Sequence, residues 1–242
     1  MSERFFLSAA PAGGRAVLEA DEARHVSRVL RARVGDEIVV FDGRGTEWTG
    51  RITAIGRDRV ELDTGSPRAA AMPPGPRLTL AVALPKGERQ KWMVEKLTEL
   101  GVSRLVPLET ARGVAEATAA AQTRLERVVI EACKQCGRNT LMEIGAGRPL
   151  DRLLAETPAG ACVVIAHPGG GPLDAATVTP ATAEMIALIG PEGGFTDDEL
   201  AAADRAGAIR ASLGPHILRV ETAAIAVAAR LVASTLRVPP VP

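Results

Sequence analysis

The sequence predicts an α/β protein in which a small, mostly β domain precedes a larger domain built on a parallel sheet. Three observations predict this class. Short apolar runs separated by turn signals fill residues 1–72, a segment rich in Pro, Gly and Ala spans 64–76, and strand-length and helix-length runs alternate after it. We therefore place the domain boundary in that segment and expect domains at 1–72 and 73–242.

The composition fits a globular protein with a sizeable core. Its 242 residues are 46% hydrophobic and 24% charged. Twenty-nine basic residues balance 29 acidic ones, which excludes nucleic-acid binding by bulk charge and requires any RNA-binding surface to be local. No apolar run has the length of a signal-peptide core or of a membrane span, so we expect a cytoplasmic protein with no membrane association.

The cysteine and histidine pattern does not favour a metal site. Three cysteines are an odd number, which predicts reduced thiols rather than disulfides. Cys133 and Cys136 are spaced as CxxC, but they fall on a predicted helix without a second pair of ligands. The histidines are scattered along the chain, at His25, His167 and His216. We therefore expect structural thiols and no bound metal.

The first domain is expected to form a small barrel. Its predicted elements are a strand at 5–7, a helix at 21–33 and strands at 37–41, 47–55 and 59–62. The turn signals Asp42-Gly43 and Gly56-Arg57-Asp58 separate the last three strands.

The predicted helix of this domain carries a cationic face. Arg24, Arg28 and Arg31 recur at i, i+4 and i+7, with His25 beside them and Arg33 just beyond. Like charges at this spacing repel, and no acidic residue within the stripe relieves them. The face is either solvated or a contact surface for RNA phosphates, and the residues alone leave both readings open. The apolar stripe of the same helix consists of Val26, Val29 and Leu30.

The second domain is expected to alternate strands and helices around a parallel sheet. The predicted strands span 78–84, 105–108, 161–166, 185–189 and 209–213, with a short piece near Met142. The predicted helices span 88–100, 123–136, 150–155, 197–206 and 222–236. In the first of these helices, one face that we expect to be buried holds Trp92, Met93, Leu97 and Leu100. The last helix is apolar on nearly every face, which favours burial on all sides.

Two glycine-marked loops stand out in the second domain. The first, Gly190-Pro191-Glu192-Gly193-Gly194, follows an apolar run and precedes a capping-box pair, Thr196 and Glu199. The second, around Gly214-Pro215, leads from a short strand into the last helix. Strand-loop-helix junctions of this kind predict ligand binding at the carboxyl ends of the strands. Neither loop is a GxxxxGK[ST] or GxGxxG cradle, so the common nucleotide fingerprints are missing.

The two loops resemble known motifs. IGPEGGFTDDE and LGPHILRVETA resemble the C-terminal motifs of the RsmE family, SPOUT-superfamily methyltransferases that modify N3 of a uridine in small-subunit ribosomal RNA. VEKLTELGV, EACKQCGRN and the N-terminal RFF extend the resemblance over essentially the whole chain. Two positions depart from the family pattern: His216 stands where Arg is usual and Val220 where Thr is usual.

The resemblance implies a fold, a cofactor and a partner. It implies a PUA-like, RNA-binding β-barrel at 1–72 and a SPOUT α/β domain at 73–242 whose C-terminal part forms a deep trefoil knot. It further implies binding of S-adenosylmethionine, methylation of a specific uridine of 16S ribosomal RNA, and a homodimer paired through the knotted domains. In this reading the cationic face of the first domain, Arg24, His25, Arg28, Arg31 and Arg33, contacts RNA.

The cofactor pocket is expected where the two loops meet. Their tight turns expose backbone N–H and C=O groups, and their apolar residues supply walls. A third segment, His167-Pro168-Gly169-Gly170-Gly171, follows a strand and either lines the same pocket or forms a plain flexible loop. The expected cofactor-binding residues are Leu188, Ile189, Gly190, Pro191, Glu192, Gly193, Gly194, His167, Leu213, Gly214, Ile217 and Leu218.

Three residues are candidates for the chemistry. Uridine N3 must lose its proton before it attacks, so the site has to stabilise charge that spreads onto the two carbonyls. We expect Arg219 or Arg138 to do this, and Glu221 either to accept the proton or to orient Arg219. Other readings stay open: Arg138 would complement the dipole at the end of its helix, and Glu221 the dipole at the start of its own.

Two other classes of function compete with the enzyme. One is a non-catalytic RNA-binding or ribosome-assembly factor, suggested by the departures at His216 and Val220. The other is a nucleotide-dependent oxidoreductase, which would need a dinucleotide fingerprint that the sequence lacks.

Overall fold

The computed structural model describes residues 3–69, 75–113, 118–173 and 183–233. The chain divides into two compact units. The first comprises Met1–Met72 together with Ile130–Leu141, and the second comprises Pro73–Val129 together with Met142–Pro242.

The first unit is built on a six-stranded sheet. Its main path runs β1-β3-β4-β5-β2, with β6 paired to β4; β1 is parallel to β3, and the other pairs are antiparallel. Inward side chains such as Phe5, Leu18, Ile52 and Leu62 form a continuous core. The strands are β1 (Arg4–Phe6), β2 (Arg15–Glu19), β3 (Glu37–Phe41), β4 (Thr46–Ile55), β5 (Arg59–Thr64) and β6 (Arg68–Ala69). Sequence patterning missed β2 and treated β6 as linker.

The helix of the first unit is shorter than predicted. α1 (Ala20–Arg24) continues as a π-helix, η1 (His25–Val29), and Arg31 lies beyond it with a left-handed φ of 51°. A π-helix closes i to i+5 hydrogen bonds, as between Leu30 N–H and the His25 carbonyl (3.1 Å), so the spacing that aligned the arginines on an α-helix does not apply. The single helical face of Arg24, Arg28 and Arg31 was therefore a wrong expectation. Val29 was also misplaced, because its side chain is 69% exposed.

The segment Ile130–Leu141 packs with the first unit, although the sequence boundary placed it in the second domain. Backbone hydrogen bonds run from Gly45 N–H to the Asn139 carbonyl (3.0 Å) and from Leu141 N–H to the Gly43 carbonyl (2.9 Å). The buried carboxylate of Glu47 accepts hydrogen bonds from Arg4 (2.7 Å), Arg68 (2.7 Å) and Asn139 (3.0 Å). These contacts explain why α3 (Ala119–Cys136) begins in one unit and ends in the other.

The second unit is built on a parallel sheet of seven strands, as the alternating pattern predicted. Its main path runs β10-β8-β7-β12-β11-β13, with β9 paired to β8. The inner strands β7, β8 and β12 are almost continuously buried, as strands covered on both faces are. The strands are β7 (Arg77–Val82), β8 (Arg104–Glu109), β9 (Glu143–Ile144), β10 (Arg148–Pro149), β11 (Cys162–Pro172), β12 (Glu184–Ile189) and β13 (Ile209–Ser212).

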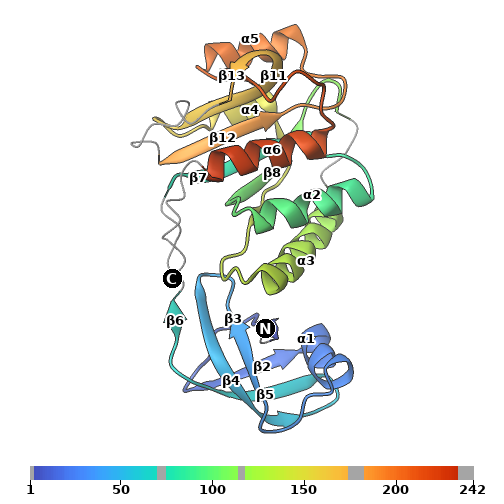
Figure 1. Cartoon of the computed structure of the whole chain (residues 1–242), viewed down its shortest axis with the longest axis vertical. Coiled ribbons are helices and arrows are strands. Elements are labelled where there is room, and N and C mark those ends of the chain that lie inside the picture. The colour runs from blue at the N-terminus through green and yellow to red at the C-terminus, as the bar shows by residue number, and fades with distance from the viewer. Residues whose placement is uncertain (1–2, 70–74, 114–117, 174–182, 234–242) are drawn as a thin grey trace. The chain divides into compact units, whose positions relative to one another are not determined.

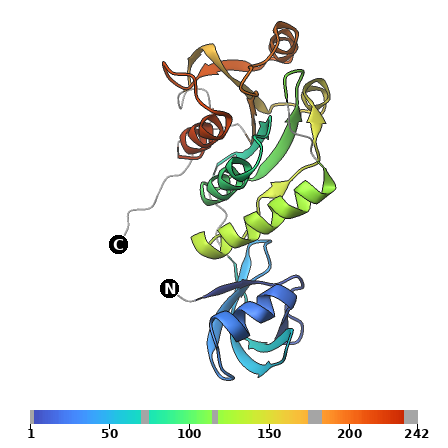
Figure 2. The same ribbon diagram turned by 90° about the vertical axis from the view of Figure 1, so that its right-hand side faces the viewer.

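Helices cover both faces of this sheet (Figures 1 and 2). On one face α4 (Leu150–Ala155) and α5 (Asp197–Arg205) share a core with Val106, Ile165 and Leu188. On the other face lie α2 (Glu88–Glu99) and α6 (Val220–Ala233), which pack against each other.

The buried face of α2 and the start of α6 differ from the sequence predictions. Trp92 of α2 was expected to be buried, but it is 48% exposed, because the buried face of α2 is formed by Met93, Val94 and Leu97. α6 begins at Val220 rather than at Thr222, and its predicted end at Leu236 lies outside the described residues.

Candidate functional site

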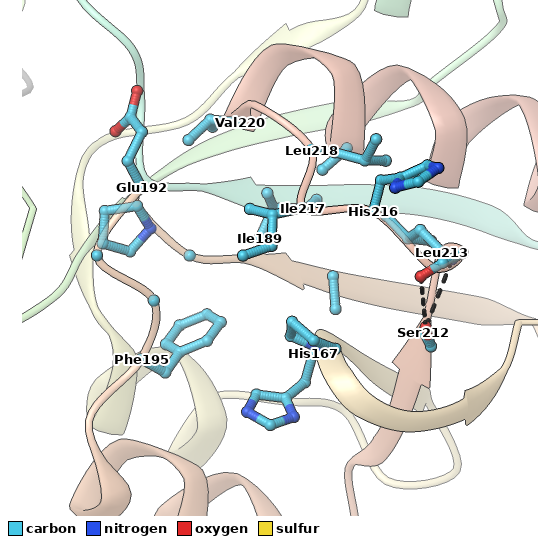
Figure 3. Close-up of a pocket in the computed structure, with 18 residues that line it drawn as sticks. His167, Ile189, Glu192, Phe195, Ser212, Leu213, His216, Ile217, Leu218 and Val220 are labelled. Carbon is cyan, nitrogen blue, oxygen red and sulfur yellow. Dashed lines mark hydrogen bonds between the residues drawn. The ribbon is translucent and has the colours of Figure 1, made fainter.

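The two glycine-marked loops meet at one edge of the parallel sheet. β12 and β13 both pair with β11 in parallel, so the carboxyl ends of all three strands reach the same edge. The loop after β12 and the loop after β13 enclose a pocket of about 360 Å³ there. In Figure 3, His167 and Phe195 lie on one side of this pocket, and Leu218 and Val220 lie on the other.

The loop after β12 is shaped by two of its glycines. A side chain at Gly190 would meet the Phe195 ring at 2.9 Å, so the absence of a Cβ there lets the ring fold over the loop. Gly194 has a φ of +70°, which favours glycine. The helix that follows is fixed by the predicted capping box: Thr196 accepts from Glu199 N–H (3.2 Å), and Glu199 accepts from Thr196 N–H (2.7 Å).

A neighbouring loop, which follows β8, holds this turn from outside. Arg112 donates a hydrogen bond of 2.6 Å to the carbonyl oxygen of Gly193. The backbone N–H of Ala111 donates to the other carboxylate oxygen of Glu199, at 2.8 Å. A Cβ at Gly193 would lie 3.3 Å from the Arg112 side chain, so Gly193 leaves little room for anything larger.

The loop after β13 supplies most of the apolar wall. The Ser212 hydroxyl donates a hydrogen bond to the Gly214 carbonyl at 3.3 Å, and it accepts one from the Gly214 N–H at 3.4 Å (Figure 3). Gly214 has a φ of +140°, another conformation that side chains rarely adopt. Ile217 is 88% exposed, which leaves an apolar side chain facing open space at the pocket.

The third wall comes from β11, whose sequence prediction ended too early. The segment from His167 onward continues the strand after a register shift, in which Ala166 and Gly171 both pair with Ala211. A Cβ at Gly170 would come within 2.5 Å of the backbone of Arg210, so only glycine allows this close approach. The irregular segment between Ala166 and Gly171 places His167 at the pocket, where its Nδ1 accepts a hydrogen bond from Gly169 N–H at 3.1 Å.

Most of the predicted cofactor-binding residues line this one pocket. Leu188 does not; it is fully buried in the core beneath the loop. Sequence reasoning missed several lining residues, among which Phe195 could have been found because it directly follows the glycine turn. The missed residues are Ala166, Phe195, Ser212, Val220 and Ala223.

The candidate catalytic residues have different surroundings. Arg219 is exposed and immediately precedes α6. Glu221 is buried in the first turn of α6, 5% exposed, and its Oε2 lies 3.7 Å from Arg89. Arg138 follows the last turn of α3 in the segment that belongs to the first unit, and burial lowers the pKa of its guanidinium.

The predicted RNA-binding residues form a looser group than expected. Arg28, Arg31 and Arg33 are exposed, whereas His25 is half-buried against the Phe5 ring, with the ring centroids 5.8 Å apart. Arg24 forms ion pairs with Asp21 and, at 3.8 Å, with Asp58. These acidic partners lie outside the stripe of arginines: Asp21 precedes it on the same helix, and Asp58 comes from a turn 34 positions away in the sequence.

The thiols of the CxxC pair have different surroundings. Cys133 is buried, and burial raises the pKa of its thiol to about 12, while Cys136 is exposed.

Within the described ranges, no group of three or more His, Cys, Asp or Glu side chains is placed to hold a metal ion. None of the helices in these ranges is both long and apolar enough to cross a membrane.

Comparison with protein families agrees with this two-part architecture. A family model for an RNA methyltransferase domain matches residues 73–232, and one for an RNA methyltransferase PUA domain matches residues 18–64. The molecule is thus a mixed α/β protein that combines a PUA-like domain with a methyltransferase domain.

Individual relatives match over nearly the whole chain. A protein of Mycobacterium bovis called "Ribosomal RNA small subunit methyltransferase E" is 32% identical over 230 residues, which cover 91% of this chain and 87% of the relative. A solved structure of a putative methyltransferase from Legionella pneumophila, in complex with SAM, is 30% identical with a TM-score of 0.88, covering 97% of this chain and 98% of that one. A ribosomal RNA small subunit methyltransferase E from Neisseria gonorrhoeae, bound to S-adenosyl methionine, is 29% identical with a TM-score of 0.86, covering 95% and 96%.

Proposed function

Because the chain belongs to the ribosomal RNA small subunit methyltransferase E family, we propose that it transfers a methyl group from S-adenosylmethionine to N3 of one uridine in 16S ribosomal RNA. The observation that carries the proposal is the convergence of the two family-like loops on a single pocket. Two relatives of known structure hold S-adenosylmethionine, which supports the same cofactor here.

The pocket has the chemistry that this cofactor needs. Ile189, Leu213 and Leu218 offer apolar surface for an adenine ring. The glycine turns at 190–194 and 214 bring backbone donors and acceptors to the pocket without side chains in the way. When bound, S-adenosylmethionine supplies an electrophilic methyl carbon. The protein's part is then to present that carbon in one direction and to keep water away.

A deep trefoil knot is part of the proposal. β12 lies between β7 and β11, and β13 lies at the edge beyond β11. The chain then leaves β13 at that edge and returns to form α6, which packs on β7 and β12. A return of this kind, past the loop that follows β12, supports a knotted path, which general topology rules would otherwise make very improbable.

The chain's own residues would carry the chemistry by positioning and charge. N3 of uridine becomes a nucleophile once its proton has left, and the anion spreads its charge onto O2 and O4. Arg219 is exposed beside the pocket-lining residues Leu218 and Val220 and would donate hydrogen bonds to those oxygens. Arg138 is the second candidate for this role. Glu221 would act close to the pocket as proton acceptor or as a positioning group.

The PUA-like unit would bind the ribosomal RNA. We assign residues 1–72 to RNA binding and 73–242 to methyl transfer, with the segment 130–141 attached to the first. The exposed cations Arg28, Arg31 and Arg33 would contact phosphates, and Arg24 less so because acidic partners already hold it. Such a protein would work in the cytoplasm, where ribosomal subunits are found.

A homodimer is proposed from α6. One helical face of α6 stays half-exposed or exposed in the single chain and consists of Thr222, Ile225, Ala226, Ala229 and Arg230. These positions recur at i, i+3, i+4, i+7 and i+8, so the small or apolar side chains of 222–229 lie along one stripe, ending at Arg230, that a second copy could cover. Light scattering at micromolar concentration tests this, and a monomer would contradict it.

The decisive experiment is a methyl-transfer reaction with isotope-labelled S-adenosylmethionine. Small ribosomal subunits or 16S RNA from cells lacking the protein are incubated with it, digested to nucleosides and analysed by mass spectrometry. The proposal expects labelled 3-methyluridine at one site. Cofactor binding without any labelled nucleoside would favour a non-catalytic RNA-binding factor instead.

A further inference from the structure

We propose that Arg89, on a helix that does not line the pocket, is a positioning residue that holds the cofactor loop after β12 against the first turn of α6, where the second cofactor loop ends. Its side chain extends from the first turn of α2. One nitrogen, Nη1, lies 3.3 Å from a carboxylate oxygen of Glu192 and 3.7 Å from a carboxylate oxygen of Glu221. The inference rests on the proposed function, because it concerns the same pocket.

The two carboxylates belong to the two halves of the pocket. Glu192 is the middle residue of the loop after β12 and lines the pocket itself (Figure 3). Glu221 follows the loop after β13 and stands between two lining residues, Val220 and Ala223. The residues that Arg89 joins are 103 and 132 positions away in the sequence. A single cation from a third element therefore connects the loop after β12 to the first turn of α6, which directly follows the loop after β13.

Burial makes the contact with Glu221 the more important of the two. The Glu192 side chain is 50% exposed, and ion pairs in water contribute little. The Glu221 side chain is only 7% exposed, and its Oε2 accepts no hydrogen bond within the described part of the chain. A buried carboxylate in that position depends on the nearby cation, because an uncompensated buried charge is strongly unfavourable.

The position of Arg89 is unusual for a helix. Cations are disfavoured near a helix N-terminus, where the dipole is positive, and Gly87 caps this end without a side-chain hydrogen bond. A residue that breaks a local rule while meeting two distant acidic groups is more simply explained by the site than by the stability of α2.

Loss of Arg89 should therefore loosen the pocket more than the fold. Without the cation, Glu192 and Glu221 would both lose their positively charged partner, and the loops would spend less time in the arrangement that binds ligand. If the binding-competent fraction falls to about a tenth, the apparent dissociation constant rises about tenfold.

The test is calorimetric titration of S-adenosylmethionine into the full-length protein and its variants. We expect Arg89→Ala to weaken binding about tenfold and Arg89→Lys to retain most of the affinity. The double variant Arg89→Ala with Glu221→Gln should recover to within about threefold of wild type, because the buried charge is gone. At saturating cofactor, the single-turnover methyl-transfer rate of Arg89→Ala should fall less than the affinity does.

The matched control is Lys91→Ala, an exposed cation on the same helix, which should leave the affinity unchanged. Should Arg89→Ala prove unfolded, Arg89→Gln keeps the length of the side chain and carries the same expectation. Affinity within twofold of wild type in the uncharged variant, or no recovery in the double variant, overturns the inference. A wild-type protein that does not bind S-adenosylmethionine at all would instead overturn the proposed function.

Discussion

The two units hold their functionally interesting segments in place by different means. In the first unit, the buried carboxylate of Glu47 receives hydrogen bonds from three donors and fixes the segment that carries Asn139. In the second, the pocket is shaped by glycine backbone and by a few side-chain contacts from Arg112 and Arg89. Several hydrogen bonds to one buried charge give stability, whereas sparse contacts leave a site that a ligand can complete. The difference predicts that variants in the two regions will affect different measurements.

The largest effect on stability is expected from Glu47→Ala. Removing one partner of a buried, hydrogen-bonded ion cluster leaves Arg4 and Asn139 without their acceptor and costs about 3–5 kcal/mol. Urea denaturation followed by circular dichroism measures it. Glu37→Ala is the matched control, because its carboxylate pairs with Arg51 in an exposed position and should cost under about 1 kcal/mol. Equal losses in both variants would contradict the comparison.

The same cluster predicts how stability depends on pH. Burial alone would raise the pKa of Glu47, but hydrogen bonds from Arg4, Arg68 and Asn139 lower it from 4.5 to about 2. A lowered pKa means that the folded state favours the ionised carboxylate, so this contribution, about 3 kcal/mol, is present above pH 4.5. It is lost as the pH falls from 4.5 towards 2. Urea midpoints measured across this range should fall less steeply in Glu47→Gln than in wild type.

Sequence patterning predicted much of the second unit and less of the first. Parallel strands and their helices leave long apolar runs, so β12 and α4 were found within a residue of their bounds. The π-helix and the left-handed Arg31 depend on how the chain packs after residue 24, and no local period shows them. The attachment of 130–141 likewise depends on Glu47, which lies 92 positions from Asn139.

In the candidate site, too, some features could be predicted from the sequence and others could not. The glycine loops could be read from the sequence because their composition is itself the signal, and the structure brings them to one pocket. The second half of β11 was missed because the sequence Pro-Gly-Gly-Gly is typical of a loop. Only its pairing with β13 makes it part of a strand. Arg89 was missed because its acidic partners come from elements far along the chain.

In the second unit, Arg219→Ala is expected to slow chemistry without affecting stability. Loss of one preorganised donor to a developing charge lowers the rate about a hundredfold. Single-turnover methylation with bound cofactor measures the step, and the dissociation constant for S-adenosylmethionine should stay nearly the same. If the rate stays within a few-fold of wild type, Arg219 only supports the loop, and Arg138→Ala becomes the variant to test in that assay.

A smaller effect is expected from the cations of the first unit. Arg28 and Arg31 are exposed, and neither forms an ion pair with another described residue. Replacing both with Ala should lower the slope of log affinity for RNA against log salt by about two units, one per phosphate contact. Arg24→Ala should change the slope less, because Asp21 and Asp58 already hold that side chain. A slope equal to wild type in the double variant would assign these cations to a solvated surface.

The most direct test of the account is calorimetric titration of S-adenosylmethionine into wild type and Gly193→Val. A valine there would crowd the Arg112 side chain, which lies 3.3 Å from the position of a Cβ, and so disturb the hydrogen bond from Arg112 to the Gly193 carbonyl that holds the loop after β12. The account predicts a saturable wild-type isotherm, no measurable binding by the variant, and equal urea midpoints for the two proteins. Equal affinities would contradict the claim that this loop forms the cofactor site.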